Sequence, residues 1–154
     1  SQKILDAMDK GTRVEQIYEA TRVLKKHNIH PSFFIQFGYP GETKTDIEKT
    51  IKMINELLPY EIGISVSYPL PGTIFYDNVK SQLEQKANWT DSDELALMFQ
   101  NTYSPVFYKR LHQYVHKTYR SHVAIENIRM ILKKPASINR RSLRKAISFL
   151  YYLI

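Results

Sequence analysis

Apolar and polar residues alternate with two different periods in the first part of the chain. Residues 14–24 and 47–58 carry apolar side chains every three or four positions, which predicts amphipathic helices. Residues 32–37 are rich in aromatic and β-branched side chains, and residues 62–68 alternate large with small ones, so both segments are predicted to be strands. A further short helix is predicted over residues 3–8.

The segments between these elements contain typical signals for helix ends. Thr12 and Thr43 each precede an acidic residue three positions later, which predicts a capping box at the start of each long helix. Asn28 is expected to take the left-handed conformation that often ends a helix. Thr73 is expected to cap a helix over residues 74–83.

A strand, a helix and a second strand in this order predict a crossover between two parallel strands. Parallel sheets need cover on both faces, and two strands alone are marginal. Residues 1–83 are therefore interpreted as one α/β unit of a larger parallel sheet or barrel whose other strands precede Ser1. The chain begins inside a helical pattern and with Ser rather than Met, which agrees with a fragment.

Residues 84–154 are predicted to be a helical region. A helix is expected over residues 91–99, and Ser104 followed by Pro105 predicts the start of a long or broken helix. A basic final helix with an apolar side is expected over residues 139–154.

Charge divides the chain at nearly the same place. The 154 residues carry 22 Lys and Arg against 15 Asp and Glu, a net charge of +7. Residues 1–104 have 11 basic and 14 acidic residues (−3), whereas residues 105–154 have 11 basic residues and one acid, Glu126 (+10). The absence of cysteine excludes a disulfide framework, a thiolate metal site and cysteine ligands to an iron–sulfur cluster within this chain. No run is long enough for a membrane span and no signal peptide is present, which predicts a soluble, cytoplasmic protein.

Two loops follow the predicted strands, where parallel sheets bind ligands. In the first, Gly38–Thr43, a glycine lets the backbone approach a ligand, although a tight strand-to-helix turn explains it equally. The second follows a strand whose large side chains are expected to pack against helices. Its small residues, Gly63, Ser65 and Ser67, either line a ligand space or accommodate bulky neighbours.

These loops carry a resemblance to a known family. Met8–Gly11, the Gly-x-Pro-Gly-Glu-Thr loop over 38–43 and the Pro-x-Pro-Gly-Thr turn over 69–73 occur in the order and spacing found in the later half of radical S-adenosylmethionine enzymes. The chain is similar to the subgroup with an amino-terminal cobalamin-binding domain, as in the anaerobic magnesium-protoporphyrin monomethyl ester cyclase type. The resemblance covers about residues 1–79.

The resemblance implies the later βα units of a partial (β/α)₆ barrel, a TIM-like fold, followed by the helical extension. It also implies an enzyme that uses S-adenosylmethionine, a [4Fe–4S] cluster and possible cobalamin for radical oxidation, cyclisation or methylation of a small organic substrate. The cluster ligands belong to the missing amino-terminal half of the same protein, so the chain alone is expected to be inactive and to hold no catalytic residue and no metal. The residues it implies as contacts of the cofactor are Gln36, Phe37, Gly38, Ser67, Tyr68 and Leu70. Glu42 receives no cofactor role, because its spacing from Gly38 is one residue longer than in some members.

Other features allow alternative functions. His112 and His116 lie four residues apart and could chelate a metal, but they are interpreted as part of a solvated face. The final helix places a basic cluster beside apolar residues, which allows a non-catalytic module that binds nucleic acid or an anionic membrane, or that presents RNA to a radical site. That cluster consists of Arg140, Arg141, Arg144 and Lys145. Aromatic residues at helical spacing between 103 and 119 are interpreted as core.

Overall fold

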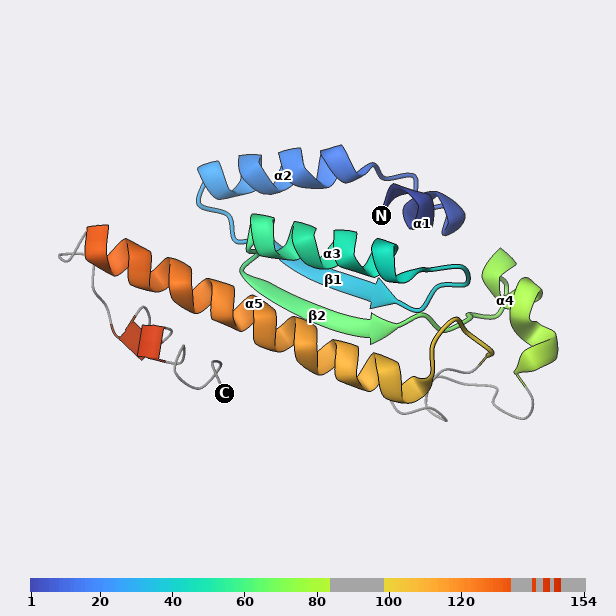
Figure 1. Cartoon of the computed structure of the whole chain (residues 1–154). Coiled ribbons are helices and arrows are strands. Elements are labelled where there is room, and N and C mark those ends of the chain that lie inside the picture. The colour runs from blue at the N-terminus through green and yellow to red at the C-terminus, as the bar shows by residue number, and fades with distance from the viewer. Residues whose placement is uncertain (84–98, 134–139, 141–142, 145, 148–154) are drawn as a thin grey trace.

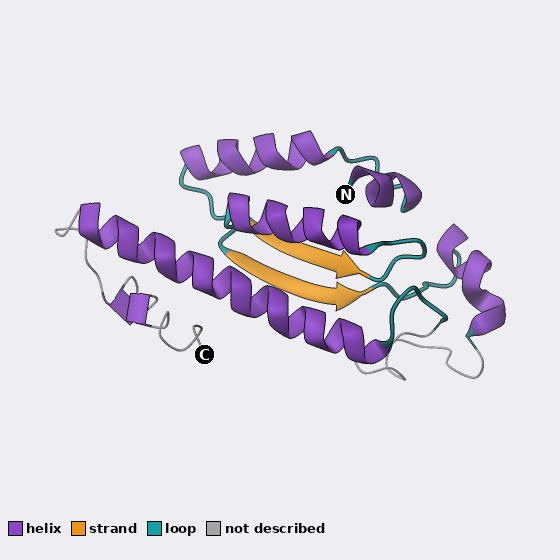
Figure 2. Cartoon of the chain, in the orientation of Figure 1, coloured by secondary structure: helices purple, strands orange, loops and turns teal. Residues whose placement is uncertain are grey.

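A computed structural model of the chain describes residues 1–83, 99–133, 140, 143–144 and 146–147. In this part of the chain, helices pack around a sheet of two strands (Figures 1 and 2). The elements in chain order are α1 (Gln2–Ala7), α2 (Val14–Lys26), β1 (Ser32–Phe37), α3 (Lys44–Leu57), β2 (Glu61–Val66), α4 (Ile74–Val79), the 3₁₀ helix η1 (Lys80–Gln82) and α5 (Pro105–Lys133).

The two strands are parallel, as the sequence predicts. Ser32 lies opposite Glu61, and the register continues to Phe37 opposite Val66. The second strand is shorter than predicted, because it ends at Val66 and leaves Ser67 and Tyr68 in the following loop. These two residues are therefore loop residues at the carboxyl edge of the sheet.

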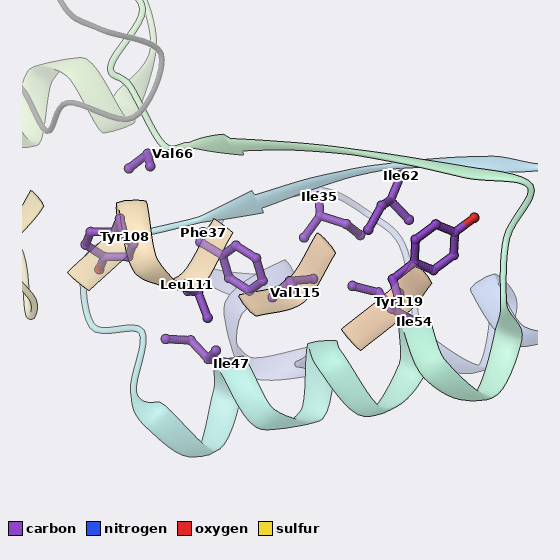
Figure 3. Close-up of a cluster of buried hydrophobic side chains, with 10 residues drawn as sticks. All are labelled: Ile35, Phe37, Ile47, Ile54, Ile62, Val66, Tyr108, Leu111, Val115 and Tyr119. Atoms are coloured by element: carbon purple, nitrogen blue, oxygen red, sulfur yellow. The ribbon is translucent and has the colours of Figure 1, made fainter. Parts of the chain in front are cut away.

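One face of the sheet forms the core. Ile35 and Phe37 of β1 and Ile62 and Val66 of β2 point toward α3 and α5 (Figure 3). The helices contribute Ile47, Ile54, Tyr108, Leu111, Val115 and Tyr119 to the same cluster. This confirms the prediction that the large residues of the second strand pack against helices.

The opposite face of the sheet carries smaller and more polar residues. In register, Phe34 of β1 faces Gly63 of β2, and Gln36 faces Ser65. The Phe34 side chain is 79% exposed. Among the described elements none covers this aromatic ring, so the small-residue face stays open there.

Three of the four predicted helix-end signals are confirmed. The Thr43 N–H donates to the Asp46 carboxylate at 3.0 Å, Thr73 Oγ1 accepts from the Tyr76 N–H at 3.1 Å, and Asn28 has a φ of 58°. The capping box predicted at Thr12 is wrong, because the amides at the start of α2 find other partners.

Helix α2 begins one residue later than a Thr12 cap requires. The Arg13 N–H donates to the Gln16 side chain at 2.8 Å, and the Val14 N–H donates to the Gln2 side chain at 2.9 Å. These two acceptors satisfy N–H groups at the start of the helix, which otherwise lack partners. One of the acceptors comes from α1, a contact that a local sequence pattern does not contain.

Helix α5 is continuous over its 29 residues and belongs to the same core as the sheet. The α/β part and the described portion of the helical region therefore share one core. The helix predicted over 91–99 lies outside the described residues, apart from Phe99, and so does most of the one predicted over 139–154. Within the described part, no helix is long and apolar enough to cross a membrane.

Candidate functional site

A cavity lies beside the carboxyl ends of the strands, the end toward which both arrows point in Figure 1 and where α1 and α4 lie. It has a volume of about 350 Å³. Its walls come from the end of α1, the two strand-end loops and the start of α4: Ala7, Met8, Asp9, Lys10, Gln36, Tyr39, Tyr68, Leu70, Thr73, Ile74 and Phe75. Ligands of parallel α/β proteins bind at this edge of the sheet.

Three of the six sequence-predicted contact residues line this cavity. Gln36 comes from the open face of β1, and Tyr68 and Leu70 come from the loop after β2. Tyr68 is 37% exposed and Leu70 is 50% exposed, so both present apolar surface that a ligand can cover. The structure thus brings together residues from two segments that are far apart in the sequence.

The other three predicted residues do not line the cavity. The Phe37 side chain is 1% exposed and lies in the core between the sheet and the helices (Figure 3). Gly38 is buried behind the loop, and the Ser67 side chain is 1% exposed. The hydroxyls of Ser65 and Ser67 are buried and have no hydrogen-bond partner. Phe37, Gly38 and Ser67 therefore supply no side chain to the cavity wall.

Gly38 cannot be replaced without strain. Its φ of 77° lies in the left-handed region that favours glycine. A Cβ atom there would lie 3.0 Å from Val66 Cγ1, 3.1 Å from Asn101 Nδ2 and 3.3 Å from Tyr108 Cε1. The backbone at the end of β1 thus packs directly against β2 and against the segment that leads into α5.

Hydrogen bonds from three separate segments hold the backbone at the end of β1. The Phe37 carbonyl accepts from the Ser67 N–H at 2.7 Å, and the Gly38 N–H donates to a carboxylate oxygen of Glu42 at 2.7 Å. The Gly38 carbonyl accepts from the side-chain amide of Asn101. The backbone of Phe37 and Gly38, between the cavity-lining residues Gln36 and Tyr39, is therefore held by hydrogen bonds to two carbonyls and one N–H.

Glu42 is a buried acid in this loop. Its side chain is 2% exposed, and burial raises its pKa to about 7, against the opposing effect of the Gly38 N–H. The Tyr108 hydroxyl is buried without a hydrogen-bond partner, and burial followed by the Glu42 charge raises the pKa of Tyr108. Glu42 lies on the core side of the loop and does not line the cavity.

Helix α1 is attached to the start of α3, directly after this loop, through a second acid, Asp46. Its carboxylate accepts from the Thr43 hydroxyl at 2.6 Å and from the Ser1 hydroxyl at 2.7 Å, and Lys3 Nζ lies 3.6 Å away. These hydrogen bonds, with a smaller contribution from the Lys3 charge, lower the pKa of Asp46. Lys3 also donates to the Gly41 carbonyl at 3.0 Å, so α1 closes one side of the cavity.

Aromatic contacts connect the remaining walls. The Tyr39 hydroxyl donates to the Ala7 carbonyl at 2.8 Å, and its ring lies 5.0 Å from that of Phe75. The Phe75 ring in turn meets Phe99 edge-on at 5.3 Å. The cavity is thus lined by side chains from separate segments of the chain.

Several site residues were missed by the sequence reasoning. Tyr39 lies within the first recognised loop and Phe75 two residues after the second, and an aromatic residue in or beside a ligand-type loop is a signal that could have identified them. Asn101 carries no local signal, because its partner Gly38 lies 63 residues away.

The remaining candidates lie elsewhere. The rings of His112 and His116 are 4.5 Å apart on α5, and burial, followed by the charges of His112 and Arg120, lowers the pKa of His116. In the described ranges, no three His, Cys, Asp or Glu side chains gather as a metal site would require. Of the predicted basic cluster, Arg140 and Arg144 are exposed and helical, whereas Arg141 and Lys145 lie outside the described residues.

The chain is similar in sequence to several curated enzymes, whereas no family model matches it. It is 29% identical over 90 residues to an uncharacterized methyltransferase of Pyrococcus horikoshii, a match that covers 58% of this chain and 20% of that protein. It is 40% identical over 76 residues to the tRNA-2-methylthio-N(6)-dimethylallyladenosine synthase of a Sulfurihydrogenibium species, covering 47% and 17%. The corresponding synthase of Ehrlichia ruminantium is 30% identical over 124 residues, covering 71% and 28%.

The chain thus matches between 17% and 28% of the length of these curated relatives. All three are named as enzymes, one a methyltransferase and two tRNA-modifying synthases. These similarities support a relationship to part of a transferase, in agreement with the resemblance to radical S-adenosylmethionine enzymes.

Proposed function

We propose that this chain is the later part of a radical S-adenosylmethionine transferase, and that the cavity at the carboxyl ends of β1 and β2 takes the adenosine part of the cofactor. The observation that carries the proposal is the meeting of Gln36, Tyr68 and Leu70 in one cavity. The resemblance assigned cofactor contacts to these residues from motifs alone. The parallel pair of strands is then one unit of a partial (β/α)₆ barrel whose other strands belong to the missing part.

The chemistry of the cavity fits a nucleoside. Its volume of about 350 Å³ lies in the range of small-molecule sites, and such sites combine apolar walls with a few polar groups. Tyr39, Tyr68 and Phe75 supply aromatic surface against which a purine can pack. The Gln36 amide supplies both donors and acceptors for the polar groups of a nucleoside.

The roles that we propose for this chain follow from the residues that it contains and from the cysteines that it lacks. In such enzymes the cofactor and its cluster supply the radical chemistry. Because the chain has no cysteine, the proposal requires the cluster ligands to come from outside this chain. The residues of this chain would bind and orient the cofactor: Gln36 and Tyr68 would hold the nucleoside beside the aromatic wall formed by Tyr39 and Phe75.

The names of the relatives favour a transferase over the other reaction classes. One relative is a methyltransferase and two act in the 2-methylthio modification of tRNA, so we extend group transfer to this chain as part of the proposal. A cobalamin-binding domain and a small organic substrate stay predictions from the resemblance. A cytoplasmic location stays a prediction as well.

Binding of S-adenosylhomocysteine to the full-length protein tests the proposal. We expect Gln36→Leu and Tyr68→Ala each to weaken binding at least about tenfold, because each removes a wall or a polar contact worth about 1.4 kcal/mol. Tyr114→Ala is the matched control, since Tyr114 is an exposed aromatic residue of α5 that does not line the cavity. Equal affinities for the wild type and both cavity variants would contradict the proposal.

A second candidate function is contact with RNA through α5. This helix carries six Lys and Arg residues against the single acid Glu126, and two of the relatives are named for a tRNA modification. Arg110 and Lys117 are both exposed and lie two turns apart on one side of α5. The variant with both residues changed to Gln is expected to bind tRNA more weakly and with a smaller salt dependence, because two phosphate contacts are lost. Unchanged binding would remove this candidate.

A further inference from the structure

We propose that Asn101, from the segment that precedes α5, is a positioning residue for the cofactor cavity. Its side-chain amide fixes the strand-end backbone from which Gln36 and Tyr39 line the cavity. The inference rests on the proposed function of that cavity. It assigns to the helical region a role in binding that the β-strand motifs do not contain.

The orientation of the Asn101 amide is determined by two hydrogen bonds. Its Oδ1 accepts from the Thr102 N–H at 2.6 Å, so this atom is the oxygen and the other must be the nitrogen. The nitrogen donates to the carbonyl of Gly38, 63 residues earlier in the chain. The Asn101 side chain therefore connects the loop before α5 to the end of β1, and its orientation is fixed by both hydrogen bonds.

The Gly38 carbonyl, which accepts the hydrogen bond from Asn101, lies next to a cavity-lining residue. Gly38 stands between Phe37, whose side chain is fixed in the core, and Tyr39, whose side chain lines the cavity. The N–H of the same residue, Gly38, is held by Glu42. Rotation of the Gly38 carbonyl would move the Tyr39 ring, which closes the cavity wall against Phe75.

The segment around Asn101 is itself anchored. Phe99 is 6% exposed and packs on Phe75, and the Gln100 N–H donates to the Gln82 side chain at 3.0 Å. The contacts of Phe99 and Gln100 thus hold in place the backbone from which Asn101 extends. A fixed supporting residue is what keeps binding groups in a productive geometry.

The test compares Asn101→Asp with two matched controls in the full-length protein. Asp keeps the acceptor for Thr102 but places an oxygen against the Gly38 carbonyl, so the connector is lost with little change of shape. Gln100→Glu introduces the same charge at the neighbouring exposed position. Tyr119→Phe removes a buried hydrogen bond to the Pro59 carbonyl, which lies at the opposite end of the sheet. This variant controls for the loss of stability that Asn101→Asp is expected to cause.

Three quantities are measured: the Kd for S-adenosylhomocysteine, the Tm, and amide exchange of the peptide covering residues 36–42. For Asn101→Asp we expect about tenfold weaker binding and faster exchange, with a fall in Tm no larger than that of Tyr119→Phe. Both controls should keep the wild-type Kd. Asn101→Ala, which removes the donor without adding a charge, should weaken binding in the same direction.

The outcomes separate this inference from the proposed function. If the wild type binds and Asn101→Asp binds equally well, Asn101 has no positioning role, although the cavity is still the cofactor site. Faster exchange with an unchanged Kd likewise overturns the inference, because it shows a purely structural role. A wild-type protein that does not bind the probe overturns the proposed function and this inference with it.

Discussion

The carboxylate of Glu42 accepts a hydrogen bond from the Gly38 N–H at 2.7 Å, and both groups are buried. An acid in such a place is usually either ionised by a charged partner or kept neutral by burial. Here burial dominates and raises the pKa of Glu42 to about 7. The loop that borders the cavity therefore contains a carboxyl group that titrates near neutral pH.

This relationship predicts that stability falls as the pH rises from about 4.5 to 7. The unfolded chain releases the Glu42 proton near pH 4.5, whereas the folded chain keeps it to about pH 7, so the folded state binds more protons in this window. The free energy of unfolding is expected to fall by up to ~3 kcal/mol across it and to be constant with respect to this group above pH 7. Urea unfolding at pH 4.5, 6 and 8 measures the change.

Glu42→Gln is the control for this pH dependence. The Gln side chain keeps an acceptor for the Gly38 N–H and has no proton to lose. We expect the variant to lack this component of the slope and to be more stable than the wild type at pH 8. The same slope in both proteins would show that Glu42 is ionised throughout the window.

Gly38→Ala is expected to destabilise the fold by roughly 3 kcal/mol, because the new Cβ adds left-handed strain to a close contact with Val66. Gly41→Ala isolates the strain alone: its φ is also positive, at 80°, but a Cβ atom at this position would meet no other atom within 4 Å. It should cost about 1 kcal/mol. Chemical unfolding measures the free energy of unfolding of both variants. Equal losses of stability in Gly38→Ala and Gly41→Ala would contradict the close packing at Gly38.

Asp46→Asn is expected to reduce stability by about 1–2 kcal/mol at neutral pH, because a neutral side chain weakens the cap of α3 and the contact with Lys3. The depressed pKa of Asp46 means that its contribution is present above about pH 4 and is lost as the pH falls through the folded-state pKa. The wild type and the variant should therefore converge in acid unfolding. A constant difference down to the lowest pH would contradict the ionic role.

Two buried tyrosines should respond differently to the loss of the hydroxyl. Tyr119 donates to the Pro59 carbonyl at 2.7 Å, so Tyr119→Phe leaves a buried acceptor unpaired and should cost about 1 kcal/mol. The Tyr108 hydroxyl has no partner, so Tyr108→Phe should be neutral or slightly stabilising. Thermal unfolding of the pair checks this, and a large loss for Tyr108→Phe would reveal a contact of its hydroxyl.

Local patterns in the sequence were sufficient for most of the α/β part. The alternation in β2 predicted which side packs against helices, and Thr43, Thr73 and Asn28 marked helix ends correctly. These features depend on residues within four positions of each other. The same holds for the position of Gln36 near the end of β1, whereas β2 ends two residues before Tyr68, which was predicted to be part of the strand.

The features that could not be predicted depend on distant residues. The start of α2 is set by Gln2 of α1 instead of by Thr12, and the loop at Gly38 is held by Asn101. Phe37 was expected to contact the cofactor, and its place in the core depends on α5, which is distant in the sequence. Long-range contacts of this kind leave no periodic trace in the sequence.

The hydrogen bond between Asn101 and Gly38 also has a consequence for the order of folding. A ribosome delivers β1 and β2 long before α5, whose residues complete the core on their covered face. During that interval the newly made strands lack both the helix and the amide that fixes their end. The cavity is therefore among the last parts of the nascent polypeptide to acquire its final shape, and mutations in α5 can impair it through the yield of folded protein as well as through affinity.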